Sequence, residues 1–140
     1  MKASRCDLPV GLIDIYPTLV DLCGLPQKSS NEGVSLVPLL NQAQPEWRFA
    51  IPTTYARGNH SLRSKQHRYI RYEDGSEELY DHSTDPHEWT NLASSGPHQK
   101  LVEQFRRELP QRNAQYHPAT QKGPVNSWFQ QHLAENGVGK

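Results

Sequence analysis

The sequence predicts a mixed α and β fold, in which a helical N-terminal part precedes a small antiparallel sheet with one packed helix. Three observations support this fold class. Apolar residues recur at helical spacing between Val10 and Gly24, their spacing changes to two from Phe49 onward, and the dipeptide Asp74-Gly75 divides the alternating segment. The chain of 140 residues has about the length of one ordinary domain.

The first helix is predicted over residues 14–23. Asp14 is placed to act as its N-cap, and Gly24 supplies the left-handed residue at which a helix stops. A second, short helix is predicted over 35–40, with Ser35 as its candidate cap. Cys23 lies on the apolar side of the first helix, where buried free thiols are common, so we expect its thiol to be buried. The apolar face of the first helix consists of Leu12, Ile15, Tyr16, Leu19, Leu22 and Cys23.

The most specific structural prediction is a β-hairpin whose two-residue turn is Asp74-Gly75. Two strands, at 49–55 and 60–64, are predicted before it. Favourable cross-strand pairs contribute about 0.2–1 kcal/mol each, and a slip of one residue would remove all of them. Folding about this turn pairs Glu73 with Ser76, Tyr72 with Glu77, Arg71 with Glu78, Ile70 with Leu79, Tyr69 with Tyr80 and Arg68 with Asp81.

The third helix is predicted over 97–109. Leu101, Phe105 and Leu109 lie one turn apart on one face of this helix, and Pro110 ends it. Residues 113–140 are predicted to form a polar tail or a short docking helix. Its one apolar cluster consists of Val125, Trp128, Phe129 and Leu133.

Composition excludes several classes of protein. Lys and Arg number 15, as do Asp and Glu, so the net charge is +0 and we expect neither a nucleic-acid nor a membrane-surface binder. No apolar run approaches the roughly 18 residues of a spanning helix. The start has no apolar core of a signal peptide, so the cellular location stays unknown. Hydrophobic residues make up only 34%, which suggests that the chain is part of something larger.

Common catalytic and metal-binding motifs are absent from the sequence. The 7 histidines include no pair at the i, i+4 spacing of a zincin motif, and His82 and His87 flank Asp85 in what is at most a weak site. The 2 cysteines, Cys6 and Cys23, fit neither a disulfide framework nor a zinc cluster. We therefore expect solvated loop histidines and no catalytic or metal-binding residue in this chain.

The segment from Arg57 to Arg71 is the most informative one for binding, because it contains no acidic residue. Arginine presents a planar fork that suits the oxygens of sulfate, phosphate or carboxylate. An anion-binding edge and a plain solvated edge are both open interpretations. With Arg68 and Arg71 assigned to the hairpin, the candidates are Arg57, Asn59, His60, Arg63 and Lys65.

Two stretches of the sequence resemble the type I, formylglycine-dependent sulfatases. The first, PVGLIDIYPTLVDLCGLP followed by GVSLVPLL, resembles the segment that follows their catalytic core. The second, TTYARGNHSLRSKQHRYIRY followed by EELYDHSTDPHEWTNLA, resembles the strands and the LYD–DP–E–NLA stretch that close the family's chain. The resemblance covers roughly residues 9–93 and is closest to iduronate-2-sulfatase-like bacterial members.

This resemblance implies the C-terminal part of an alkaline-phosphatase-like α/β fold. Residues 1–47 would end the sulfatase core, 48–112 would form the C-terminal antiparallel-sheet subdomain, and 113–140 would be the tail. In the family this subdomain borders the substrate cleft. The resemblance therefore implies that Asn59, His60 and Arg63 are candidate substrate-binding residues for a sulfated carbohydrate.

The resemblance also implies which parts of the enzyme this chain lacks. Sulfatases use a formylglycine made from a C/S-x-P/A-x-R motif and a divalent metal, usually calcium. Cys6 is followed by DLPV and Cys23 by GLPQ, so neither lies in that motif. The family's catalytic and metal-binding residues would all lie before residue 1.

Three hypotheses about function follow from these expectations. The first is a C-terminal portion of a sulfatase, inactive alone, from a split, truncated or misassigned reading frame. The second is a free-standing module that binds sulfated glycans through Arg57, His60, Arg63 and Lys65. The third is a partner that completes a separately encoded sulfatase core.

Overall fold

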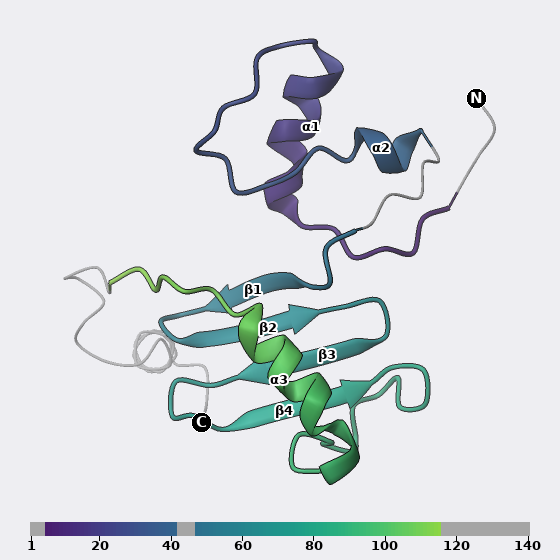
Figure 1. Ribbon diagram of the computed structural model, residues 1–140, viewed down its shortest axis with the longest axis vertical. Coiled ribbons are helices and arrows are strands. Elements are labelled where there is room, and N and C mark those ends of the chain that lie inside the picture. The colour runs from purple at the N-terminus through teal and green to yellow at the C-terminus, as the bar shows by residue number, and fades with distance from the viewer. Residues whose placement is uncertain (1–4, 42–46, 116–140) are drawn as a thin grey trace, which may run out of the picture.

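The computed structural model describes residues 5–41 and 47–115 of the chain. A helical N-terminal part lies beyond strand β1, and a four-stranded antiparallel sheet in the order β1-β2-β3-β4 carries helix α3 across one face (Figure 1). The strands are β1 (Ile51–Tyr55), β2 (Asn59–Arg63), β3 (His67–Arg71) and β4 (Glu77–Asp81). The helices are η1 (Leu12–Asp14), α1 (Ile15–Leu22), α2 (Val37–Leu40), η2 (Gly96–His98) and α3 (Gln99–Arg107).

Asp14 organises the N-terminal part and is completely buried. Its carboxylate accepts hydrogen bonds from the backbone N–H of Gly11 (2.8 Å) and of Val34 (3.0 Å), and it pairs with the guanidinium of Arg48. Burial by itself would raise the pKa of Asp14, but these donors, Arg48 above all, lower the pKa below its usual value. Asp14 stands at the N-cap position of α1 as predicted, but its side chain caps no helical N–H. It connects α1 to the segment that enters β1.

The predicted apolar face of α1 exists, but the described residues do not cover it. The buried residues of α1 are Pro17, Thr18 and Val20, and Cys23 is exposed. The expectation of a buried thiol at Cys23 was therefore wrong. The exposed apolar side chains are Leu12 (86%), Ile15 (49%), Tyr16 (58%), Leu19 (55%) and Leu22 (60%).

The core lies between the sheet and α3. Leu62, Tyr69 and Leu79 come from three neighbouring strands, and Val102 and Phe105 come from α3; all five are completely buried. The rings of Tyr69 and Phe105 stack with their centroids 5.4 Å apart. The predicted apolar face of the third helix is therefore the one that packs on the sheet.

The predicted register of the hairpin was wrong by one residue. In the structure Tyr69 lies opposite Leu79 and Arg71 lies opposite Glu77, and the turn has three residues, 73–75. The N–H of Gly75 donates to the carbonyl of Tyr72, and Gly75 has φ 90°. A type I turn followed by a left-handed glycine is a common hairpin connection, which the prediction of a two-residue turn overlooked.

Packing against α3 explains why this register is preferred. Residues directly opposite each other point to the same face, so the observed register places Tyr69 and Leu79 together under α3. The predicted register would have placed them on opposite faces. The ion pairs change accordingly: Arg71 pairs with Glu77 rather than Glu78, and Arg68 pairs with Glu88 rather than Asp81.

Candidate functional site

Asn59, His60 and Arg63 all lie on strand β2, but the structure does not bring the three together. Alternate residues of a strand point to opposite faces. His60 shares the face of Leu62, which packs under α3, while Asn59 and Arg63 belong to the other face. His60 must therefore be considered separately from its two neighbours.

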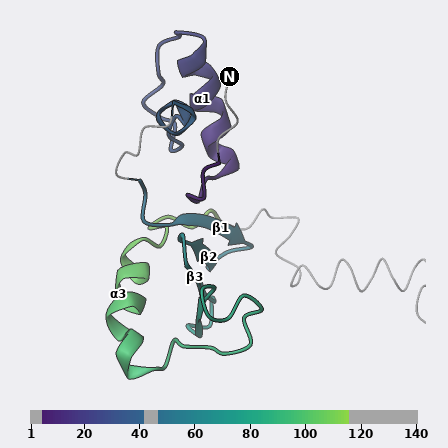
Figure 2. The same ribbon diagram turned by 90° about the vertical axis from the view of Figure 1, so that its right-hand side faces the viewer.

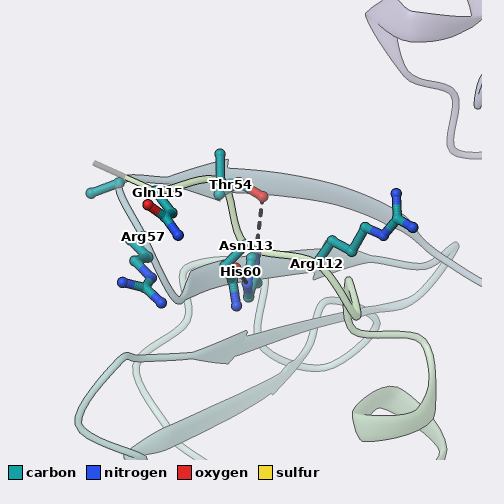
Figure 3. Close-up of a pocket in the computed structure, with 8 residues that line it drawn as sticks. Thr54, Arg57, His60, Arg112, Asn113 and Gln115 are labelled. Carbon is teal, nitrogen blue, oxygen red and sulfur yellow. Dashed lines mark hydrogen bonds between the residues drawn. The ribbon is translucent and has the colours of Figure 1, made fainter. Parts of the chain in front are cut away.

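His60 connects β1 to the segment that follows α3. Its side chain is 5% exposed, with Nδ1 2.9 Å from Thr54 Oγ1 and Nε2 2.8 Å from Asn113 Oδ1 (Figure 3). Because an amide oxygen only accepts, Nε2 donates to Asn113, while Nδ1 is hydrogen-bonded to the Thr54 hydroxyl. Both ring nitrogens are thus satisfied, so His60 shapes the site around it and orients Asn113.

A hollow of about 390 Å³ opens beside His60. Residues 112–115 form one wall, and the end of β1 with its turn into β2 forms the other. An adjoining hollow of about 510 Å³ shares Arg57, His60 and Asn113 and also contains Arg71 and Glu73. The residues that line the first hollow are Thr54, Ala56, Arg57, His60, Arg112, Asn113, Ala114 and Gln115.

The first hollow is cationic. Arg57 and Arg112 form no salt bridge with any acidic side chain in the described ranges, and they lie to either side of His60 in Figure 3. The turn that carries Arg57 is fixed by two left-handed residues, Ala56 (φ 53°) and Gly58 (φ 77°). Guanidinium groups on a fixed turn suit the oxygens of sulfate, phosphate or carboxylate.

Asn59 has a local role in the structure. Its side-chain oxygen accepts from the N–H of Glu73 (3.2 Å), and its amide donates to the carbonyl of Arg57 (3.1 Å). It therefore connects the turn between β1 and β2 to the turn between β3 and β4. This arrangement holds the turn of Arg57 beside the hollow.

Arg63 lies at the other end of β2, directly opposite Arg68 on β3. One of its terminal nitrogens, Nη1, is buried and has no hydrogen-bond acceptor among the described residues. Burial, together with the charge of Arg68, lowers the pKa of Arg63, and the charge of Glu88 opposes this effect. Lys65, in the turn between β2 and β3, is exposed.

The contribution of residues 112–115 to the site was not predicted from the sequence. Asn113 was expected in the polar tail, yet this residue contacts His60 across 53 positions of the chain. The segment lacks any periodic pattern, so nothing in it predicted this contact. The only sequence signal was Pro110, which ends the helix and forces the chain to change direction there.

Metal binding finds no support in residues 5–41 and 47–115, where no three His, Cys, Asp or Glu side chains gather. His82 does not combine with Asp85, because its Nε2 pairs with Glu88. The donor set that calcium requires is therefore not found in the described part, and calcium remains an expectation for full-length family members. The same described residues contain no helix long and apolar enough to cross a membrane.

The sheet, the helix across it and the preceding helical segment define the small C-terminal domain of the alkaline-phosphatase-like sulfatase fold. Residues 2–115 match the family model described as N-sulphoglucosamine sulphohydrolase, C-terminal, and the chain belongs to this family.

Two relatives are longer proteins, each of which the chain matches over only a part of its length. A sulfatase of Formosa agariphila is 37% identical over 134 residues, which cover 96% of this chain and 25% of that protein. Arylsulfatase K of Danio rerio is 37% identical over 107 residues, which cover 64% of this chain and 20% of that protein. The chain thus spans about a quarter or less of these relatives.

Two solved structures share its fold. A protein in complex with its substrate D-glucosamine-2-N,6-O-disulfate aligns with a TM-score of 0.61 at 25% identity, over 68% of this chain and 22% of that one. The phosphonate monoester hydrolase of Agrobacterium radiobacter aligns with a TM-score of 0.56 at 25% identity, over 68% of this chain and 23% of that one.

Proposed function

We propose that this chain is the C-terminal part of a sulfatase that hydrolyses sulfate esters of sugars, and that it is inactive without a catalytic core. The observation that carries this proposal is the apolar face of α1, which residues 5–41 and 47–115 leave uncovered. Five large apolar side chains on one helical stripe, each about half exposed or more, are unusual for a complete protein. In this proposal they pack against the portion of the enzyme that precedes them in the longer relatives.

The cationic hollow supports a sulfated substrate. Arg57 and Arg112 lie on the two walls of the hollow, with the side chain of Arg112 extending away from His60 in Figure 3, and His60 holds those walls together through Thr54 and Asn113. In this proposal Arg57 binds sulfate oxygens, and His60 positions Asn113 for the sugar. A structural relative that was solved with a disulfated glucosamine gives this substrate class independent support.

Asn59 and Arg63 have different parts in this proposal. Asn59 acts through the turn of Arg57, because both polar ends of its side chain already bond to backbone there. Arg63 would meet substrate only on the sheet face away from α3, since it points to that side of β2. We therefore expect different effects on substrate binding when Asn59 and Arg63 are replaced one at a time.

The subfamily is a finer part of the same proposal. The resemblance over residues 9–93 is closest to the iduronate-2-sulfatase-like bacterial sulfatases, and the proposal therefore extends to a 2-O-sulfated uronic acid as the substrate class. The likeness to a phosphonate monoester hydrolase means that this domain alone does not define the reaction. Substrate choice therefore has to be measured on a complete enzyme.

The test uses a chimaera in which this chain replaces the matching quarter, approximately, of the Formosa agariphila sulfatase. The rest of that sulfatase supplies the catalytic core. Sulfate release is measured for the 140-residue chain alone and for the chimaera, with 2-O-sulfated iduronate and 6-O-sulfated glucosamine saccharides. We expect no turnover by the chain alone, with or without calcium, and turnover by the chimaera. Metal-dependent turnover by the chain alone would contradict the proposal.

A second function has one specific observation in its favour, namely that eight described residues of this chain line the cationic hollow without any other protein. A free-standing module for sulfated glycans would retain the chain on heparin in a salt-sensitive way, and Arg57→Gln would abolish this retention. The matched control is Arg5→Gln, which removes an exposed arginine that pairs with Asp7 far along the chain from the hollow. A partner that completes a separately encoded core would instead form a complex with that core on co-expression.

A further inference from the structure

A tryptophan stands out from the loop between β4 and α3. Trp89 is 84% exposed, more than any other aromatic side chain in the described ranges. Figure 2 shows the segment after β4 extending on the side of the sheet away from α3. The indole therefore belongs neither to the core nor to the hollow beside His60.

This loop is fixed by hydrogen bonds at both of its ends. The carboxylate of Asp81 accepts from the N–H of Ser83 (2.8 Å), and that of Asp85 accepts from the N–H of Thr90 (2.8 Å). Asn91 then attaches the loop to β4, because its oxygen accepts from the N–H of Leu79 (3.0 Å). Hydrogen bonds of Asp85 and of Asn91 therefore hold the chain on both sides of Trp89, which is unusual for an exposed loop residue.

The residue before Trp89 has a strained backbone. Glu88 has φ 60°, a region that non-glycine residues rarely occupy. Its carboxylate holds Arg68 through two contacts of 3.2 Å and also pairs with Nε2 of His82. Strained positions of this kind concentrate at functional sites, where the surrounding contacts maintain them.

The indole also has an aromatic neighbour. The ring of His87 stacks against that of Trp89, with centroids 5.0 Å apart and 25° between their planes. Because Trp89 remains 84% exposed, its other face is open. The pair offers a flat apolar surface, and the residues on either side of Trp89 in the chain, Glu88 and Thr90, are polar.

We propose that Trp89, backed by His87, is a stacking platform for a sugar ring of a glycan chain. A pyranose has an apolar face of C–H groups that packs on an indole, and hydroxyls at its rim that need polar partners. A single exposed ring with polar neighbours along the chain fits that chemistry. The contiguous apolar stripe of α1 fits a protein surface instead. The inference rests on the proposed function, because a glycan is the substrate proposed there.

The platform and the cationic hollow are separate sites. Trp89 follows the Asp81 end of β4, whereas the hollows lie toward its other end, beside Arg71 and the turn before β4. Stacking on an indole needs no sulfate, but binding to Arg57 does. Unsulfated and sulfated forms of one oligosaccharide therefore distinguish the two sites.

The experiment titrates the ¹⁵N-labelled 140-residue chain with an unsulfated hexasaccharide of alternating uronic acid and N-acetylglucosamine, and then with its sulfated form. We expect the indole N–H signal of Trp89 to move with both saccharides. The signal of Trp47, whose indole donates to the carbonyl of Pro9 (2.8 Å), should stay in place. Trp89→Ala should raise Kd for the unsulfated form by about tenfold, and Trp89→Phe by much less.

The matched control is Tyr55→Ala, which removes an aromatic side chain that is 63% exposed on β1. It should leave Kd unchanged. An unmoved Trp89 signal, an equal Kd for Trp89→Ala, or a signal that moves only when the rest of a sulfatase is attached would each overturn the platform. A working platform in a chimaera that releases no sulfate would instead count against the proposed function alone.

Discussion

Helices α1 and α3 both carry apolar residues at helical spacing, but only α3 has its apolar face covered by the described residues. Val102 and Phe105 of α3 are completely buried against the sheet, whereas Leu19 of α1 is 55% exposed. The sheet and α3 thus form a core of their own. The N-terminal part is held by polar contacts around Asp14 and leaves its apolar surface open. Amphipathic spacing identifies a packing face without identifying what covers it.

The largest expected effect comes from removing a side chain of the covered helix. Phe105→Ala leaves a cavity beneath Tyr69 and Phe49 and should lower the free energy of unfolding by about 3–5 kcal/mol. The matched substitution Leu19→Ala on α1 should change it by less than about 0.5 kcal/mol in the chain alone. Urea denaturation of both variants measures the difference. Equal losses would mean that the face of α1 is covered after all.

Low pH should lower the free energy of unfolding of the sheet part, because Glu77 becomes protonated. Its carboxylate accepts from Arg106, Tyr69 and Arg71, and these donors, Arg106 first, lower its pKa to about 2 although burial opposes the shift. A lowered pKa contributes stability above the unfolded pKa near 4.5, and this contribution is lost as the pH falls toward 2. The free energy of unfolding should fall by up to about 3 kcal/mol over this range.

Unfolding free energies measured between pH 5 and about pH 2 test this dependence. Glu77→Gln should flatten the profile, because the remaining side chain does not titrate. The neighbouring Glu78→Gln serves as the control, since Glu78 pairs with no arginine in the described residues. A steep profile that persists in Glu77→Gln would assign the acid sensitivity to another group.

The stability of the N-terminal part should depend on the buried carboxylate of Asp14, as the stability of the sheet part depends on the side chain of Phe105. Asp14→Ala leaves Arg48 and two backbone N–H groups without their acceptor, which should cost about 2–3 kcal/mol. Asp7→Ala, which removes the acid of an exposed pair with Arg5, should cost less than about 0.5 kcal/mol. Hydrogen exchange of the α1 amides reports the difference. Equal exchange in both variants would show that Asp14 does not hold this part together.

The smallest of these effects concerns the hairpin turn. Gly75→Val places a β-branched residue at φ 90° and should destabilise the sheet by about 1–2 kcal/mol. Gly96→Ala, at a glycine with open space around it and no positive φ, should have little effect. Thermal unfolding compares the two variants. An unchanged midpoint for Gly75→Val would mean that this turn is not formed as described.

Local patterns predicted the positions of the helices and strands, because periodicity and turn residues are properties of neighbouring positions. The hairpin register could not be predicted in this way, since α3, about thirty residues later, decides which face Tyr69 and Leu79 share. The same holds for the site. His60 could be singled out from a basic segment, but its partner Asn113 lies 53 residues away. Helix-capping rules likewise could not predict the three contacts of the Asp14 carboxylate, with Gly11, Val34 and Arg48.

Protection of Cys23 tests the central claim most directly, namely that the apolar face of α1 packs against a sulfatase core. Cys23 follows α1 on its apolar stripe and is exposed in this chain, as is Cys6 near the start. The measurement compares the rate of thiol labelling at Cys23, followed by mass spectrometry of its peptide, in the chain alone and in the chimaera with the Formosa agariphila segment. We predict fast labelling in the chain alone and at least about tenfold slower labelling in the chimaera, because burial blocks the reagent. Equal rates in the two proteins would contradict the account.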